Sequence, residues 1–385
     1  MKKHHAIAMA ISALSAGLLI SCAKPNDDAV TTDTAASESE VSNESAAQQT
    51  PATDTASTSK ITPVTISADT QKAYLTHVAD DIVVPAYSDA AAQSQALHDL
   101  AIKHCASGSV QGAPLTELRE QWLKLAQAWA GAEMINFGPA TQSMSNLYIN
   151  YYPDERGLVH SGVADLIAAN PNLTPAQLAQ ESAIVQGVPG LEEALYANDR
   201  LEAAQCAYVI SASEALTTRL KDIEATWQKD SVSLLAIDQT TSSDQGLNQW
   251  VNSLLSLIET MKSSAIEQPL GLNGKSKGHL PAMTAGQSRA IINAKLATIN
   301  QAFTDPVLTA ILSRDNTDTA VGDKLSTALA DTSTLLAQMP EDISQADKAT
   351  QQKLYDHLTT VTQIIKRELI PTLGIRVGFN STDGD

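Results

Sequence analysis

Aromatic side chains are scarce in this chain, where phenylalanine, tryptophan and tyrosine together make up 4% of 385 residues. Aromatic residues favour β-strands, whereas alanine and leucine, which abound here, favour helices. No segment carries the sustained alternation of apolar and polar residues that is typical of a half-buried strand. The sequence therefore predicts an all-α protein.

Basic residues are also few. The chain has 25 lysines and arginines against 43 aspartates and glutamates, which gives a formal net charge of −18. Such a charge argues against nucleic acid and against an anionic lipid surface as partners, because both repel an acidic protein. It would suit a small cationic ligand.

The familiar motifs of hydrolases and nucleotide-binding proteins are missing. The sequence has no HExxH, no histidine pair four residues apart, no GxSxG and no glycine-rich phosphate loop. The histidines beyond the N-terminal segment are scattered, whereas a catalytic zinc site needs three protein ligands around an open position. No spacing in the sequence therefore predicts an enzyme.

Only one long apolar run occurs, and it lies at the N-terminus. The run from Ala6 to Ile20 follows Lys2 and Lys3 and is shorter than the roughly 20 residues that cross a bilayer, so it predicts a secretory signal peptide over 1–21. The sequence Leu-Ile-Ser-Cys that ends at Cys22 resembles the lipobox of bacterial lipoproteins. This resemblance implies that Cys22 is lipidated and anchors the protein to a membrane of the cell envelope, facing the periplasm or the cell surface.

The chain has three cysteines, and Cys22 is assigned to the lipid anchor. An exported protein meets an oxidising environment, where the remaining two, Cys105 and Cys206, could pair. The sequence leaves two alternatives open, namely one Cys105–Cys206 disulfide or two buried free thiols.

The body of the protein follows a polar N-terminal segment. Residues 22–62 hold almost no large apolar side chains, so we expect a disordered, lipid-anchored linker. Beyond it, apolar residues recur at helical spacing, as in Trp122, Leu125, Ala126 and Trp129. A polar stretch near 236–246 marks a boundary. The pattern predicts two helical-bundle domains over 63–238 and 239–385.

Three segments break the helical pattern, at 152–157, 186–193 and 374–385. Such breaks are where functional residues are expected. Thr174 and Gln177 predict a capping box at the start of a helix that is interrupted at Gly187, with Glu192 one turn beyond the break. Polar residues in or near the three segments are candidate ligand-binding residues: Asp154, Arg156, Glu192, Arg289, Asn380, Asp383 and Asp385.

Over about residues 65–385 the chain resembles the imelysin-like family of bacterial cell-envelope proteins. The resemblance rests on Gly138-Pro139, PDERG at 153–157, QGVPGLEEALY at 186–196 and GFNSTDGD at 378–385. It implies two helical bundles related by pseudo-symmetry, with the motif regions at their interface. Members are implicated in iron uptake, and the family is also classed with metallopeptidases.

The family motif GxHxxE departs from its pattern in this chain. It reads Gly-Val-Pro-Gly-Leu-Glu from Gly187 to Glu192, so Pro189 stands where the family has histidine. Proline has no lone pair to offer a metal. The resemblance thus carries over Glu192 alone as a candidate metal ligand, and it names iron as a candidate ligand of the protein.

Three functions remain open from the sequence. The first is a non-catalytic binding protein linked to metal acquisition, with its site at the interface of the bundles and an envelope transport protein as a partner; carboxylates suit iron, which accepts oxygen ligands. The second is a metal-dependent peptidase, which would need a substitute nitrogen ligand such as His160. The third is a structural or adhesive lipoprotein with a degenerate site.

Overall fold

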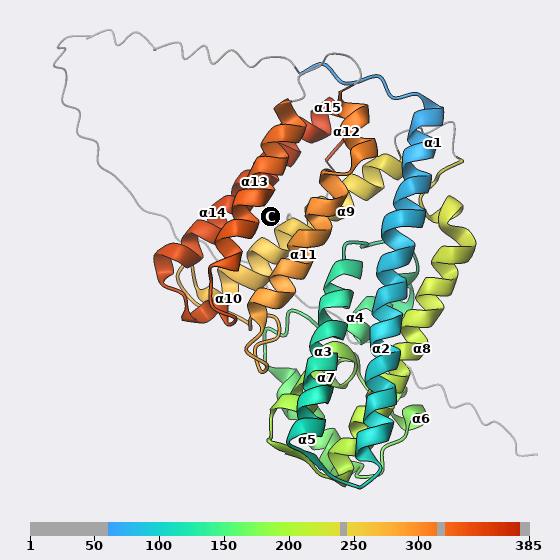
Figure 1. The fold of residues 1–385 in the computed structure, drawn as a ribbon, viewed down its shortest axis with the longest axis vertical. Helices are drawn as coiled ribbons and strands as arrows, with labels where there is room; N and C mark the ends of the chain where they lie inside the picture. The colour runs from blue at the N-terminus through green and yellow to red at the C-terminus, as the bar shows by residue number, and fades with distance from the viewer. Residues whose placement is uncertain (1–60, 239–244, 314–319, 378–385) are drawn as a thin grey trace, which may run out of the picture. The chain divides into compact units, whose positions relative to one another are not determined.

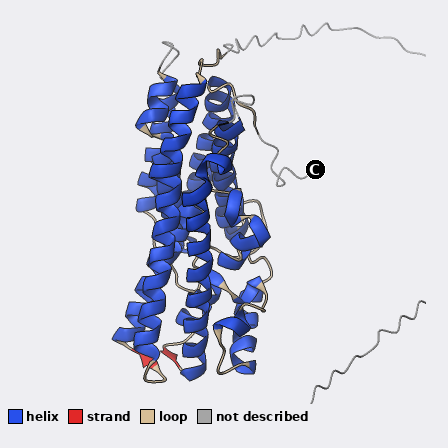
Figure 2. Ribbon diagram, turned by 90° about the vertical axis from the view of Figure 1, so that its right-hand side faces the viewer, coloured by secondary structure: helices blue, strands red, loops and turns tan. Residues whose placement is uncertain are grey.

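The computed structural model describes residues 61–238, 245–313 and 320–377, all of which belong to one compact unit that spans Ser59–Asp385. Helices dominate this part (Figure 2). Two short strands, β1 (Val110–Gln111) and β2 (Arg200–Leu201), pair antiparallel with Val110 opposite Leu201. The all-α prediction is confirmed. Within the described ranges, no helix is both long enough and apolar enough to span a bilayer.

A first group of helices is built from the N-terminal half of the unit (Figure 1). Its four main helices pack side by side: α2 (Val84–Cys105), α3 (Ala113–Ala132), α7 (Gly187–Tyr196) and α8 (Ala203–Leu234). Shorter helices complete it: α4 (Ser145–Ile149), α5 (Leu158–Ala169), α6 (Pro175–Leu178) and 3₁₀ turns at Gly138–Ala140, Gln142–Met144 and Ala183–Val185.

A second group follows from the C-terminal half (Figure 1). Its main helices are α9 (Gln245–Lys262), α11 (Ser288–Phe303), α13 (Ala320–Ala337) and α14 (Lys348–Ile364). The short elements are α10 (Gln268–Leu270), α12 (Pro306–Leu312), α15 (Ile370–Thr372) and a 3₁₀ turn at Ile343–Gln345, while α1 (Ala68–His77) packs against α9. The predicted boundary between domains was placed at 236–246, and residues 239–244 of it lie outside the described residues.

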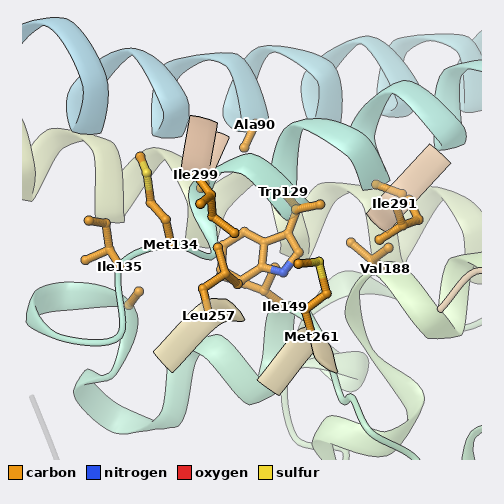
Figure 3. Close-up of a cluster of buried hydrophobic side chains, with 14 of the residues drawn as sticks. Ala90, Trp129, Met134, Ile135, Ile149, Val188, Leu257, Met261, Ile291 and Ile299 are labelled. Carbon is orange, nitrogen blue, oxygen red and sulfur yellow. The ribbon is translucent and has the colours of Figure 1, made fainter. Parts of the chain in front are cut away.

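One hydrophobic core runs through both groups, because α11 packs against α3. The stripe predicted on α3 is buried, and Trp129 lies at its centre (Figure 3). The Trp129 indole is surrounded by Ile149 of α4, Met261 of α9 and Ile299 of α11. A large flat side chain thus fills the seam where the two groups of helices meet.

In the described ranges, three helical segments contain a widened, π-helical turn shortly before a proline. Each turn ends two residues before a proline: Val78–Val83 before Pro85, Ser263–Glu267 before Pro269, and Ile365–Leu369 before Pro371. Proline lacks an N–H group and its ring crowds the carbonyl four residues earlier. Opening the preceding turn to an i→i+5 pattern accommodates the ring while the helix continues.

The structure joins Cys105 to Cys206 by a disulfide, with a Cα–Cα distance of 5.5 Å. Cys105 is the last residue of α2, and Cys206 lies in the first turn of α8. The bond therefore ties the ends of two neighbouring long helices beside the β1–β2 pair.

Candidate ligand-binding cavity

A cavity of about 620 Å³ lies where the two groups of helices meet. One side is formed by α3, α5 and α7, and the other by the segment before α11 and by α11 itself. Most of the lining is apolar, with two tryptophans, Trp122 and Trp129, on the α3 side. A cavity of this size and lining is typical of sites for small organic molecules.

The segment Gly187–Gly190 begins a helix, so the predicted interruption of a longer helix at this point is wrong. The helix capped by Thr174 is only α6, and α7 starts at Gly187. Gly187 has a φ of +69°, and a Cβ there would collide with the carbonyl oxygen of Ile149. Pro189 is tolerated because it sits in the first turn, where a helix has no partner for its N–H groups.

Glu192 projects from α7 into the cavity wall and is 9% exposed. Its Oε1 accepts a hydrogen bond from the backbone N–H of Ala285, at 2.9 Å, across the seam between the groups. Burial raises the pKa of Glu192 from 4.5 to about 7, and the negative charge of Glu193 acts in the same direction. This carboxyl group therefore holds its proton to a higher pH than a free glutamate does.

Glu193 lies beside Glu192 on the same wall. Its carboxylate accepts a hydrogen bond from Thr284 Oγ1 at 3.2 Å and lies 3.1 Å from Nδ1 of His160 on α5. The His160 side chain is 74% exposed, so it stands at the rim of the cavity. Two adjacent glutamates thus bridge α7 to α5 and to the segment before α11.

Asp154 also lines the cavity, but both of its oxygens are engaged. They accept hydrogen bonds from the N–H groups of Leu158, at 3.0 Å, and Val159, at 2.9 Å, at the start of α5. A carboxylate at this position stabilises the helix N-terminus. Asp154 therefore fixes the position of α5, and with it His160.

The other predicted site residues do not gather here. Arg156 is exposed, and Arg289 lies apart from the cavity lining. The Arg289 guanidinium pairs with Glu341 and donates to the carbonyl of Met339, so it holds the end of α13 against α11. Asn380, Asp383 and Asp385 lie outside the described residues.

The cavity wall contains a buried ion pair that was not predicted from the sequence. Lys295 Nζ lies 2.6 Å from Oε2 of Glu133, and the Lys295 side chain is 4% exposed. A signal was present in the sequence, because Lys295 lies on the apolar face of α11 between Ile291 and Ile299. A lysine at such a position needs a buried partner.

A second missed feature is the indole of Trp129. Trp129 is 3% exposed, and its Nε1–H has no hydrogen-bond partner in the described part of the chain. By contrast, Nε1–H of Trp122 donates to the carbonyl of Val188 at 3.0 Å. Sequence periodicity placed both rings in the core but gave no information about which N–H lacks an acceptor.

The fold and cavity together define a class: an all-α protein whose two helix groups share one core and enclose a ligand-sized cavity at their seam. The sequence matches the Imelysin family, Peptidase_M75, over residues 83–365. This match covers most of the chain, which therefore belongs to the imelysin family. A search of curated proteins gives no match.

The chain is also similar to a protein of solved structure, an imelysin-like protein from Psychrobacter arcticum 273-4. The two sequences are 74% identical, and the similarity covers 83% of this chain and 100% of the other. The folds superpose with a TM-score of 0.82. The similarity agrees with the family match and with the all-α fold.

The family's classification with metallopeptidases implies a metal, and the described residues show whether a metal would fit. Pro189 replaces the motif histidine, and the described ranges hold no group of three His, Cys, Asp or Glu side chains placed to bind a metal ion. The Asp154 carboxylate accepts hydrogen bonds from the start of α5, and the Glu133 carboxylate is paired with Lys295. The described cavity lining does not fit a bare metal ion held by three protein ligands.

Proposed function

We propose that this imelysin-family chain is a non-catalytic binding protein of the cell envelope, linked to metal acquisition, that holds a cationic or metal-bearing small molecule in its cavity. The observation that carries the proposal is the lining of that cavity. Its walls are apolar, while Glu192 and Glu193 lie next to each other on one side. Carboxylates on an apolar wall attract positive charge more strongly than they would in water.

Two features favour binding over catalysis. Proline at position 189 removes the nitrogen ligand of the family motif, and His160, the candidate substitute, is paired with Glu193 at the cavity rim. The volume of about 620 Å³ is also far larger than a single ion needs, and it falls in the range of organic ligands. A metal would then arrive as part of a larger complex.

The cell-envelope location rests on the N-terminal sequence. The basic start, the short apolar run and Cys22 have the pattern of a lipoprotein signal, and residues 22–62 would serve as the linker to the membrane. The Cys105–Cys206 disulfide supports this location, because disulfides persist in oxidising compartments. An anchored binding protein would pass its ligand to a transport protein in the same envelope.

The test is to identify what the protein retains. The full chain would be purified from the envelope of a bacterial host and analysed by native mass spectrometry together with elemental analysis. We expect a retained small molecule, or iron with an organic carrier, that is lost in Glu192→Gln and kept in Glu214→Gln, a matched change on α8 outside the cavity. A generic peptidase assay runs beside it. Cleavage of peptides that depends on added metal and on Glu192 would overturn the proposal in favour of the enzyme.

A further inference from the structure

We propose that the ligand of the cavity is an organic cation, with a flat apolar body that packs on the α3 wall and a protonated amine that lies against Glu192 and Glu193. This inference rests on the proposed function, since it requires a binding protein. It narrows that function from a cationic or metal-bearing molecule to one chemical class.

The α3 wall has the shape to receive a flat body. Trp122, Ala126, Trp129 and Ala130 all line the cavity, and their spacing places them along one face of the helix. The two alanines leave room between the two indoles. Tyr152 contributes a further ring, and its hydroxyl lies 2.9 Å from the carbonyl oxygens of both Ser264 and His279. Aromatic faces also attract cations.

The Trp129 indole points independently to a ligand with a hydrogen-bond acceptor. Its N–H is buried and lacks an acceptor among the described residues, and Figure 3 places the ring among apolar side chains such as Ile149, Val188 and Met261. Buried donors in folded proteins nearly always find a partner. An ether, carbonyl or hydroxyl oxygen on the ligand would supply it.

The charges around the cavity select a cation. The charge of Lys295 is neutralised by Glu133 at 2.6 Å, and the Asp154 carboxylate accepts hydrogen bonds from N–H groups at the start of α5. This leaves Glu192 and Glu193 facing the cavity from α7, with His160 at the rim. Their hydrogen bonds to Ala285 and Thr284 come from neutral groups, so a protonated amine would place a positive charge against the two carboxylates.

Glu192 adds a signature that distinguishes a cation from other ligands. Its raised pKa, about 7, follows from burial and from the charge of Glu193. The other titratable groups of the lining are Glu133 after α3, Tyr151 and Tyr152, Asp154 and His160 at α5, and His279 and Lys295 on the opposite side. A cation beside Glu192 favours its ionised form, so binding near neutral pH should release a proton.

The experiment is a charge series of one scaffold, measured by isothermal titration calorimetry on the full chain in detergent. The probes are 5-methoxytryptamine, 5-methoxytryptophol and 5-methoxyindole-3-acetate, which are cationic, neutral and anionic at pH 7. We expect the amine to bind roughly tenfold more tightly than the alcohol, and the acid to bind most weakly. Titrations in buffers of different ionisation enthalpy should show proton release for the amine alone.

Variants separate the contributions of Glu192 and of the Trp129 N–H to the binding affinity. Glu192→Gln should weaken the amine roughly tenfold, leave the alcohol nearly unchanged and abolish proton release. Trp129→Phe keeps an aromatic ring but removes the N–H, so it should weaken 5-methoxytryptamine more than tryptamine, which lacks the ether oxygen. Glu214→Gln is the carboxylate control and should alter none of these values. Circular dichroism of each variant verifies that it has folded.

The outcomes distinguish this inference from the proposed function. Equal affinity for the three probes would overturn the inference of an organic cation and leave a binding cavity in place. An affinity for the amine that Glu192→Gln does not change would do the same. Binding of ferric ion alone, with none of the three probes bound, would also overturn it while supporting metal acquisition. If neither a probe nor iron binds and no molecule is retained on purification, both the inference and the proposed function fail.

Discussion

Lys295 on α11 and Glu133 at the end of α3 form an ion pair of 2.6 Å across the seam between the two groups of helices. The lysine is almost fully buried, whereas the glutamate is 26% exposed. Asn150 lies within hydrogen-bond distance of the second carboxylate oxygen, at 3.3 Å. This pair holds two helices from opposite halves of the chain at the wall of the cavity.

The first prediction concerns this pair. Glu133→Gln should lower the free energy of unfolding by roughly 3 kcal/mol, since it leaves the Lys295 ammonium buried without its counter-charge. The double variant Glu133→Gln/Lys295→Met should recover most of that loss, because it removes the buried charge as well. Urea unfolding followed by circular dichroism measures both. A single variant as stable as the wild type would mean that Lys295 reaches water.

The second prediction concerns pH and Glu192. The pKa of this group is about 7 in the folded protein and near 4.5 in the unfolded chain, so the folded state binds the proton more tightly. Its stabilising contribution is therefore complete below about pH 4.5 and declines as the pH rises to about 7, by roughly 3 kcal/mol. Glu192→Gln should remove this decline. Unfolding measured at pH 5 and pH 8 should show the variant gaining stability over the wild type only at the higher pH.

The third prediction concerns Gly190 in the first turns of α7. A Cβ at this position would collide with the hydroxyl of Tyr208, which is buried and donates to the carbonyl of Val185 at 2.9 Å. Gly190→Ala should destabilise the protein by about 1–3 kcal/mol. Gly322→Ala serves as the control, because among the described residues its Cβ would meet only Leu312, at 3.9 Å. The melting temperature should fall for Gly190→Ala and should stay the same or rise slightly for Gly322→Ala.

The fourth prediction concerns the disulfide. Cys105 and Cys206 are separated by 101 positions in the sequence, so the bond restricts a long loop of the unfolded chain. Replacing both cysteines with alanine should lower stability by about 2–5 kcal/mol. Adding a reductant to the wild type should produce a similar loss, and should have no effect on the double variant. A reductant effect on that variant would point to a different target.

The fifth prediction concerns Cys22. Replacement by serine removes the thiol that the lipid would modify, so Cys22→Ser should move from the membrane fraction to the soluble envelope fraction. Immunoblots of fractions washed with carbonate would measure the shift, and Cys105→Ser serves as a control that keeps the anchor. Retention of Cys22→Ser in the washed membranes would contradict a lipid anchor at this residue.

Local patterns in the sequence were enough to predict much of the fold. The capping box of Thr174 and Gln177 forms, because it depends on neighbouring residues alone. The stripe of Trp122 and Trp129 is buried, as the helical spacing of its apolar residues predicts. The start of α7 at Gly187 was not predicted, since a glycine–proline segment can end or begin a helix. In the structure α7 begins there, and the carbonyl of Ile149 occupies the place of a Cβ at residue 187, so glycine is required.

The cavity was predicted only in part. The family motif predicts Glu192, and Asp154 is predicted as a polar residue in a segment that breaks the helical pattern. The partner of Lys295 and the unsatisfied N–H of Trp129 depend on contacts between distant segments, which no periodicity reports. Arg289 was predicted as a ligand-binding residue, but its guanidinium donates hydrogen bonds to carbonyl groups at the end of α13.

The position of Trp129 also bears on how the chain is made. Its indole packs against Leu257 and Met261 of α9 and Ile299 of α11 (Figure 3), all of which are synthesised after it. A polypeptide emerges from the ribosome N-terminus first, so α3 is made before α9 and α11, the helices that pack against its tryptophan face. Completion of the first helix group must wait for the arrival of the second. A nascent chain stalled near residue 238 would expose this apolar surface and would be a target for chaperones.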